Sequence, residues 1–435
     1  MQTPVAAPTQ HAPPSSSLPA EPHPLDLVSL GKIVQIREVL LRAEAAGQRV
    51  FRLESGDPSF SAAPHVLDAI GEAGRAGKTH YIPNNGIPQL RKALADKVRT
   101  KNGLQGVTDE DIFVTNGAMH ALYATFGALL EPGDEVIIPD PMWTEVAENI
   151  RLAGGVPVGV PVRAAEGFEY SPERVAAAIT PRTRAIFVNT PHNPTGAVLS
   201  RATLQALVDT ARSHKLWIVS DEAYEDVLFE PATHTSIGSL AGDYAEHVIS
   251  IFSFSKSHAM SGLRIGYVVT RAALLHDRLP KLLRCTINGV NSLAQWGALA
   301  AITGPQDHLP KMRDEYHVRR DLLLAALTGI EGVHPFVPRG TFFAWADLDE
   351  SLYARLGVED ADALSRALAA RGIGSAPGDA FGNSCANAIR FSFSADTKMV
   401  REGSAALRKA LTGETPLGET PLGETPLGEG ARAPG

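Results

Sequence analysis

A lysine flanked by small hydroxyl residues is the most reactive feature of this sequence. Lys256 lies in the stretch SFSKSHAMSGLRIGY, close to Ser253 and Ser255 and eight residues before Arg264. A desolvated lysine beside other cations has a lowered pKa, and its free amine attacks carbonyl groups. Hydroxyls and a bidentate guanidinium suit a phosphate group. The stretch predicts that Lys256 holds an aldehyde cofactor whose phosphate binds Ser253, Ser255 and Arg264, although most lysines are simply surface residues.

Two further motifs carry polar residues suited to the same site. NTPHNPTGAV contains Asn193, whose amide can donate to an ionised oxygen, although Asn-Pro and Thr-Gly are also frequent turn formers. VSDEAYEDVLF places Asp221 at the end of an apolar run, with Tyr224 three residues later. The carboxyl ends of parallel strands are where α/β folds bind ligands. A structural salt bridge is the alternative role for Asp221, because a buried unpaired carboxylate is costly.

A glycine turn before an apolar helix supplies an anion site. TNGAMHAL places Gly117, Ala118 and Met119 at the predicted helix start, where free backbone N–H groups attract a phosphate. Trp143 follows in the next motif, EPGDEVIIPDPMW, as either a core residue or a ring that stacks on a ligand.

Taken together, these motifs resemble those of the fold type I pyridoxal-phosphate enzymes, specifically the class I aminotransferases of the bacterial aspartate and aromatic branch. S-x-S-K-x(7)-R-x-G is the cofactor-lysine signature of that family, and the other motifs follow in family order over about residues 27–411. The resemblance implies a ping-pong aminotransferase that moves an amino group from an L-amino acid to a 2-oxo acid. It also implies pyridoxal 5'-phosphate as the cofactor.

The resemblance implies a role for each motif residue. Lys256, Asp221 and Tyr224 are the expected catalytic residues: Lys256 forms the imine, Asp221 pairs with the pyridine nitrogen, and Tyr224 bonds the phenolic oxygen. The full set of expected cofactor-binding residues is Gly117, Ala118, Met119, Trp143, Asn193, Asp221, Tyr224, Ser253, Ser255, Lys256, Arg264 and Tyr81.

Substrate recognition is expected from residues at both ends of the chain. Arg390 in AIRFSFS matches the arginine that clamps the substrate α-carboxylate, with Gly56 and Asn193 beside it. Tyr81 matches a tyrosine that reaches across a dimer interface to the phosphate, so a homodimer with shared sites is expected.

The side chain of the substrate is less constrained. Met119 stands where aspartate-using relatives carry a lysine, which favours an aromatic or apolar amino acid, with 2-oxoglutarate as the usual acceptor. Lys32 is either a replacement charge or part of a solvated helix face.

Other functions remain open alternatives at this point. A carbon–sulfur β-lyase uses the same Lys, Asp and Arg, and an aspartate aminotransferase is a further, weaker candidate. A transcription regulator with an aminotransferase-like domain requires a DNA-binding module ahead of that domain, where this chain has only a Pro-rich leader and one helix.

Strands and helices must alternate to bring these motifs together. DEVIIP, RAIFVN, LWIVS and HVISIF are short runs of the kind found in strands buried on both faces, and helical segments such as RATLQALVDTARSHK separate them. This alternation predicts an α/β fold with a mostly parallel sheet between helices, plus a smaller discontinuous α+β domain.

Composition shifts suggest the domain boundaries. We expect a disordered leader at 1–24, an N-terminal arm with part of the small domain at 25–60, and the large cofactor-binding domain at 61–304. The small domain then covers 305–411, with the early helix GKIVQIREVLLRAEAAG packed on it, and a disordered GETPL-repeat tail covers 412–435.

Charge and cysteine content argue against several other classes of protein. A net charge of -8 without a basic block argues against nucleic acid, and no apolar run reaches membrane-spanning length. Only two cysteines, Cys285 and Cys385, are present, which favours a reducing cytoplasm and gives no reason to expect a metal site.

Overall fold

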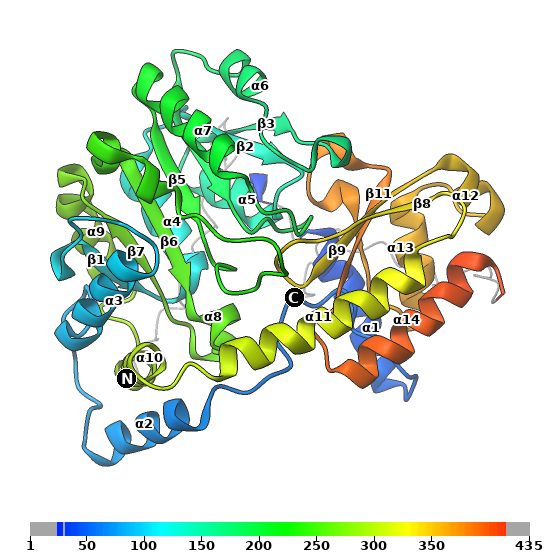
Figure 1. Cartoon of the computed structure of the whole chain (residues 1–435), viewed down its shortest axis with the longest axis horizontal. Helices are drawn as coiled ribbons and strands as arrows, with labels where there is room; N and C mark the ends of the chain where they lie inside the picture. Colours follow the sequence, from blue (N-terminus) through cyan, green and yellow to red (C-terminus); the bar gives the residue numbers. More distant parts are fainter. Residues whose placement is uncertain (1–23, 29–30, 415–435) are drawn as a thin grey trace, which may run out of the picture.

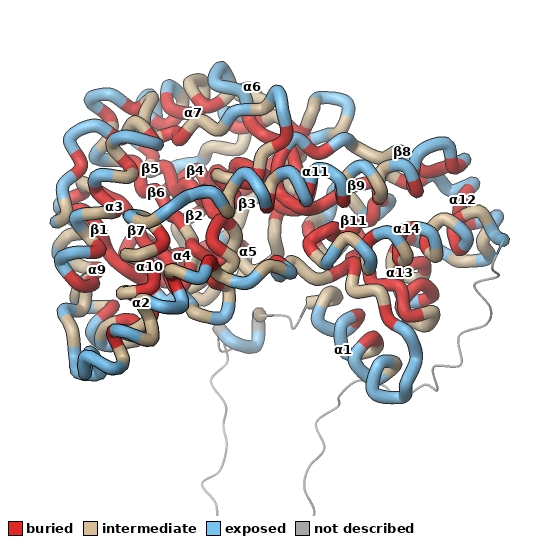
Figure 2. Tube along the Cα trace, turned by 60° about the horizontal axis from the view of Figure 1, so that its bottom comes forward, coloured by how far each residue is buried: buried red, intermediate tan, exposed pale blue. Residues whose placement is uncertain are grey.

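A computed structural model describes residues 24–28 and 31–414 of the chain. The predictions for the leader up to residue 23 and for the repeat tail from residue 415 lie outside these residues. Within them, no helix combines the length and the apolar character needed to cross a membrane. Buried residues concentrate in two units that lie side by side (Figure 2).

The larger unit is built on a seven-stranded sheet. In spatial order its strands are β1 (Ile112–Thr115), β7 (Gly266–Thr270), β6 (Val248–Ser253), β5 (Trp217–Asp221), β4 (Thr183–Asn189), β2 (Glu135–Asp140) and β3 (Val156–Pro161). Only β7 runs antiparallel to its neighbours β1 and β6; the pairs from β6 through β3 are parallel. The predicted mostly parallel sheet is confirmed.

The central strands are apolar because helices cover both sheet faces. Along β4, Ile186 and Val188 pack in one layer, whereas Ala185 and Phe187 pack in the opposite layer. The strands of DEVIIP, RAIFVN, LWIVS and HVISIF all form as β2, β4, β5 and β6. Both faces of each strand are therefore removed from water, as continuous apolar runs predict.

Helices cover both faces of this sheet, and a further group of helices packs near β1 and β7 (Figure 1). Those of the larger unit are α2 (Pro64–Arg75), α3 (Pro88–Thr100), α4 (Gly117–Leu129), α5 (Thr144–Leu152), α6 (Pro172–Ala177), α7 (Arg201–His214), α8 (Phe254–Ser257), α9 (Ala273–Thr286) and α10 (Ser292–Thr303). One layer contains α4, α5 and α9, the other contains α6 and α7, and α2, α3 and α10 pack near β1 and β7.

The smaller unit has an antiparallel sheet of four strands, again buried under helices. Its strands, in spatial order, are β10 (Ala376–Pro377), β11 (Ala388–Ser392), β9 (Phe343–Leu348) and β8 (Val333–Phe336). Its helices are α1 (Lys32–Ala45), α11 (His308–Leu327), α12 (Glu350–Leu356), α13 (Ala361–Ala370) and α14 (Thr397–Thr412). The long helix α11 leads from the larger unit to the smaller one (Figure 1).

The early helix α1 belongs to the smaller unit by packing. Ile36 and Leu40 form a small core with Val50 and with Ala369 of α13. Helix α1 thus packs beside the C-terminal third of the chain, which makes that unit discontinuous. The exact domain boundaries at residues 60 and 304 stay a prediction.

Gly196, in the loop that carries the NPTG motif, is a point of close contact between the two units. Its φ is +76°, and a Cβ built there would lie 2.3 Å from Cβ of Pro338. Its carbonyl oxygen accepts bonds from the backbone N–H groups of Arg339 and Gly340 at 2.8 and 2.9 Å. A side chain at this position would force apart the loops that precede β9 and follow β4.

Gly196→Ala should therefore destabilise the protein by about 2 kcal/mol or more, since left-handed strain of about 1 kcal/mol adds to a steric clash. Gly167→Ala is the matched control: its φ is +67°, but nothing lies within 4 Å of a Cβ built there. Urea denaturation of both variants measures the difference. Equal loss of stability in the two would show that the contact around Gly196 does not matter.

Candidate active site

A cavity of about 370 Å³ lies where the two units meet. The larger unit contributes the ends of β4 and β5, the first turns of α4 and α5, and the turn α8. The smaller unit contributes β9, β11 and α1, and the segment 54–57 closes the remaining side. Ligand-binding positions at the carboxyl ends of parallel strands are the usual arrangement in α/β folds.

Most of the residues predicted from sequence line this one cavity. They are Gly56, Ala118, Met119, Trp143, Asn193, Asp221, Tyr224, Ser253, Ser255, Lys256, Arg264 and Arg390. Gly117 lies just behind its wall, against Arg264. Tyr81 lies elsewhere: its side chain is 89% exposed and borders a different surface hollow with residues 289–293.

Lys256 is held in the short helix α8, directly after β6. The Ser253 hydroxyl caps this turn by accepting from the backbone N–H of Ser255 at 3.2 Å. The ammonium group of Lys256 donates to the carbonyl oxygen of Gly56 at 2.7 Å. Burial, helped by the charges of Arg264 and Arg390, lowers the pKa of Lys256 to about 8 against the opposing effect of Asp57 and Asp221. About a tenth of the amine is thus unprotonated at pH 7, far more than for an ordinary lysine.

Asp221 ends β5 with its carboxylate buried in the cavity wall. One oxygen accepts from the backbone N–H of Ala223 at 3.1 Å. Burial raises the pKa of Asp221 to about 6, and the attraction of Lys256 is too weak to reverse this effect. The carboxylate therefore lacks the nearby cation that would hold it firmly ionised.

Asn189, Asn193 and Arg390 form a buried chain that fixes the opposite wall. The side chain of Asn189 donates to the carbonyl oxygen of Asp221 and accepts from the backbone N–H of Asn193, both at 2.9 Å. Asn193 Oδ1 in turn accepts from Arg390 Nη1 at 3.0 Å. Since its oxygen is occupied, the free face of the Asn193 amide is a donor.

Arg390 reaches the cavity from β11, where it is 3% exposed. Its Nη2 donates to the carbonyl oxygen of Glu54 at 3.0 Å, and its guanidinium lies 4.1 Å from the ring centre of Phe343. Its Nε is buried without a partner. Burial lowers the pKa of Arg390 to about 10, so the group stays charged at neutral pH. An anion could bind it without displacing either protein contact.

The start of α4 and the turn after α8 form a cradle lined by donors. Gly117 has φ +79°, and a Cβ there would lie 2.6 Å from Nη2 of Arg264. The guanidinium of Arg264 is oriented by a bond from Nη1 to the carbonyl oxygen of Ser261 at 2.6 Å. Only glycine allows the arginine to approach the helix N-terminus this closely, which concentrates positive charge at one place.

These observations fit pyridoxal 5'-phosphate. The Gly117–Arg264 cradle suits a phosphate, the partly unprotonated Lys256 suits an aldehyde, and Asp221 suits a protonated ring nitrogen as its missing cation. The lining contains no feature that conflicts with this group. Among the described residues, no cluster of His, Cys, Asp or Glu could hold a metal ion.

Several lining residues were not predicted from the sequence. They are Ile33, Arg37, Glu54, Ser55, Asp57, Glu145, Asn189, Ala223, Ser261 and Phe343. Asn189 is the first residue of the NTPHNPTG motif, and Asp57 follows Gly56. Both therefore adjoin residues that the sequence had already placed in the site. Phe343 and Arg37 carried no such signal, because only the packing of the small unit brings them here.

The structure also resolves the alternatives left open for Lys32. Its ammonium lies 2.5 Å from Asp379 and 3.5 Å from Asp362, in ion pairs outside the cavity lining. Lys32 therefore does not replace the charge that Met119 lacks.

The buried charge of Asp221 predicts a gain in stability on its removal. Because the folded-state pKa of about 6 exceeds the ordinary 3.8, the free energy of unfolding falls as pH rises from about 4 through 6. Asp221→Asn, prepared without cofactor, should be about 1–3 kcal/mol more stable than the parent at pH 7.5, and this difference should shrink toward pH 4. Urea denaturation at the two pH values checks it. The exposed Asp277→Asn serves as control, and a gain independent of pH would contradict the explanation.

Comparison with known proteins gives a consistent result. The family model "Aminotransferase class I and II" matches residues 48–407. A probable aspartate/prephenate aminotransferase of Thermus aquaticus is 40% identical over 351 residues, which is 80% of this chain and 88% of that protein. An arginine–pyruvate transaminase of Pseudomonas aeruginosa is 38% identical over 82% of this chain and 88% of its own length.

Solved structures agree with the sequence relatives. The aspartate aminotransferase of Thermus thermophilus with maleate superposes with a TM-score of 0.83 at 34% identity, covering 90% of this chain and all of that one. With this match in sequence, in fold and in the geometry of the cavity, the chain belongs to the class I and II aminotransferases and is a pyridoxal 5'-phosphate-dependent transaminase.

Proposed function

We propose that Lys256, Asp221 and Tyr224 catalyse the transamination, with Arg390, Asn193 and Gly56 binding the amino acid. The observation that carries this proposal is the position of Lys256 in a single cavity with Asp221 on one wall and Arg390 on another. These three groups would supply a base, an anion for the ring nitrogen and a cation for the substrate carboxylate.

Lys256 is the proton carrier. When bound, pyridoxal 5'-phosphate supplies an aldehyde that condenses with amines and a ring that withdraws electrons from the substrate Cα. The Lys256 amine, with its pKa of about 8, would act as the base that removes the proton from the substrate Cα. Once protonated, the same group would return the proton as an acid. Its hydrogen-bond partner, the Gly56 carbonyl, is uncharged, so this contact does not hold the amine in a buried ion pair.

Asp221 and two hydrogen-bond donors hold the ring. The Asp221 carboxylate pairs with the ring nitrogen and keeps it protonated. Asn193 donates its amide to the phenolic oxygen, as does the Tyr224 hydroxyl, whose pKa is raised by burial. Trp143 lies along the same cavity wall and provides a face for stacking, while Ser253, Ser255, Arg264 and residues 117–119 bind the phosphate.

Arg390 orients the substrate by its α-carboxylate. The unpartnered Nε and the remaining N–H groups of Arg390 present a fork to the cavity, and a bidentate carboxylate matches it. Gly56 lies opposite, where its backbone contacts the same carboxylate. The Cα–H bond is thereby held near the Lys256 amine.

The donor side chain is aromatic or apolar, and 2-oxoglutarate is the acceptor. Met119, Ile33 and Phe343 give the cavity apolar walls. Asn149 donates to the Met119 sulfur at 3.4 Å, which fixes this side chain in place. Relatives of similar identity are named for aspartate, prephenate or arginine, so overall similarity alone does not decide the substrate.

The active form is a homodimer in the cytoplasm. The exposed ring of Tyr81, remote from the cavity of its own chain, supports a role at the phosphate of a second copy. Two free thiols, Cys285 and Cys385, support a reducing compartment.

Lys256→Ala tests the proposal directly. The variant should lose nearly all turnover, because no other amine lines the cavity among the described residues. Borohydride reduction of the loaded parent protein, followed by peptide mass mapping, should place the pyridoxyl group on Lys256. Lys281→Ala, which removes an exposed lysine, should keep full activity. A pyridoxyl adduct on another peptide would refute the assignment.

Met119→Lys tests the substrate class. Restoring a cation should raise kcat/KM for aspartate relative to phenylalanine by about 10-fold to 100-fold, the effect of one charge-assisted hydrogen bond. Met119→Leu should leave the preference unchanged. A parent enzyme that already prefers aspartate strongly over phenylalanine would overturn the proposal.

A further inference from the structure

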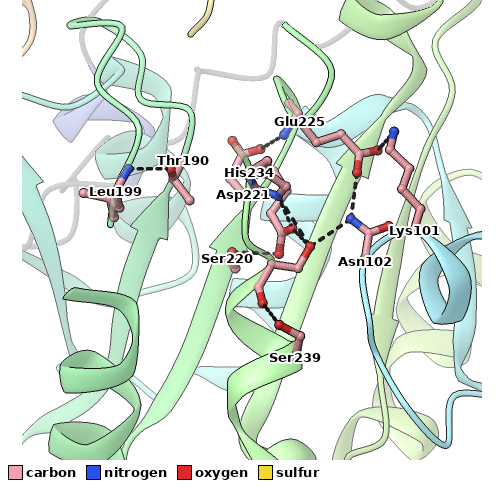
Figure 3. A network of polar contacts seen from close by, with 12 residues as sticks. Lys101, Asn102, Thr190, Leu199, Ser220, Asp221, Glu225, His234 and Ser239 are labelled. Atoms are coloured by element: carbon pink, nitrogen blue, oxygen red, sulfur yellow. Dashed lines mark hydrogen bonds and ion pairs between the residues drawn. The ribbon is translucent and has the colours of Figure 1, made fainter. Parts of the chain in front are cut away.

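A network of polar side chains, most of them buried, lies close to Asp221 (Figure 3). We call it the rear network, and its members are Lys97, Lys101, Asn102, Glu222, Glu225, His234 and Ser236. None of these residues lines the active-site cavity. The network thus has no direct contact with a ligand there, and its buried charges need another explanation.

Glu225 is the neutralised end of the rear network. One carboxylate oxygen pairs with the ammonium groups of Lys97 and, at 3.6 Å, Lys101. The other oxygen accepts from Asn102 Nδ2 at 2.7 Å. These two lysines strongly oppose the effect of burial and hold the pKa of Glu225 well below its usual range. Its charge is therefore balanced locally.

Glu222 is the opposite end, and it has no such balance. Its side chain is 0% exposed, yet its carboxylate is bonded by Ser220 at 3.0 Å, Ser236 at 2.5 Å and His234 at 2.8 Å. Among the described residues, no lysine or arginine pairs with it. The two hydroxyls satisfy hydrogen bonds of Glu222 without cancelling its charge, and His234 is the one partner that can carry a positive charge. The field of Glu222 therefore extends to nearby groups.

The direction of hydrogen bonds keeps Glu222 an acceptor. Asn102 Nδ2 also donates to the Ser236 oxygen at 2.8 Å, so the Ser236 hydroxyl hydrogen is directed to Glu222. The Ser236 hydroxyl therefore donates to the carboxylate and does not accept from it.

Asp221 is the group that this charge reaches. The two residues are consecutive at the end of β5, and side chains that follow one another in extended chain point to opposite sides. Asp221 thus faces the cavity while Glu222 faces the rear network. The charge of Glu222 is among the causes that raise the pKa of Asp221, after burial itself.

We propose that Glu222 is a positioning residue that acts through Asp221: its buried carboxylate, paired with no lysine or arginine among the described residues, strengthens the hold of Asp221 on a protonated ring nitrogen of pyridoxal 5'-phosphate. This inference rests on the assignment of Asp221 to the ring nitrogen proposed above. A second negative charge behind the first makes the site more attractive to a pyridinium than to a neutral ring. At several ångströms and an intermediate effective dielectric, one such charge changes binding by about tenfold.

The test compares two cofactors on protein stripped of cofactor. One is pyridoxal 5'-phosphate, and the other is 1-deazapyridoxal 5'-phosphate, in which a C–H group replaces the ring nitrogen. Dissociation constants from quenching of tryptophan fluorescence give the preference of each variant for the nitrogen-containing ring. Glu222→Gln keeps the side-chain volume and the hydrogen bonds to hydroxyls, and should reduce this preference by about tenfold.

Ser220→Ala is the matched control. It removes the 3.0 Å hydrogen bond to Glu222 but leaves the carboxylate charge, so the preference between the two cofactors should stay as in the parent. Should Glu222→Gln give no folded protein, Glu225→Gln changes the field behind Asp221 instead, because it leaves Lys97 without its carboxylate partner while Lys101 keeps Asp226. That positive field should also reduce the preference, by a smaller factor.

The outcomes separate this inference from the function on which it rests. Equal weakening of both cofactors by Glu222→Gln, or no weakening, overturns the role of Glu222. Asp221→Asn is measured in parallel: if it lowers the preference while Glu222→Gln does not, the assignment of Asp221 stands and only the present inference fails. If Asp221→Asn also leaves the preference unchanged, both are overturned.

Discussion

A buried carboxylate without a close cation is the constraint on which this active site depends. Asp221 ends a central strand, is almost fully removed from water, and has only a backbone N–H group and the distant charge of Lys256 to stabilise it. Such an arrangement weakens the empty protein, and it favours the binding of a cation at this point. Both faces of β5 pack against layers of helices. This packing stabilises the fold enough to keep the Asp221 carboxylate buried.

The remaining groups are held relative to Asp221 by backbone contacts and amides. Asn189 connects the carbonyl of Asp221 to the backbone of Asn193, and Asn193 connects onward to Arg390 in the other unit. The groups proposed to bind the substrate and to hold the ring are therefore linked by three buried hydrogen bonds. Because each bond is shielded from water, it is stronger than the same bond at the surface.

The sequence was sufficient wherever chemistry and local structure coincide in one short segment. The lysine turn, the NPTG loop and the strand that ends at Asp221 each combine a reactive residue with its own turn or strand signal, and all reach the cavity. The antiparallel strand β7 and the aromatic wall at Phe343 could not be predicted this way, since their positions depend on the packing of distant segments. Glu222 adjoins Asp221, yet its role depends on His234 and Ser236, which a loop brings to it.

The contact between the Lys256 amine and the Gly56 carbonyl joins residues 200 positions apart in the chain. Ile33 and Arg37 of α1 border the same chamber. A truncation that enters α1 (Lys32–Ala45) would thus alter the wall of the cavity that contains the Lys256 amine. Anyone who shortens this protein for expression should leave this helix intact.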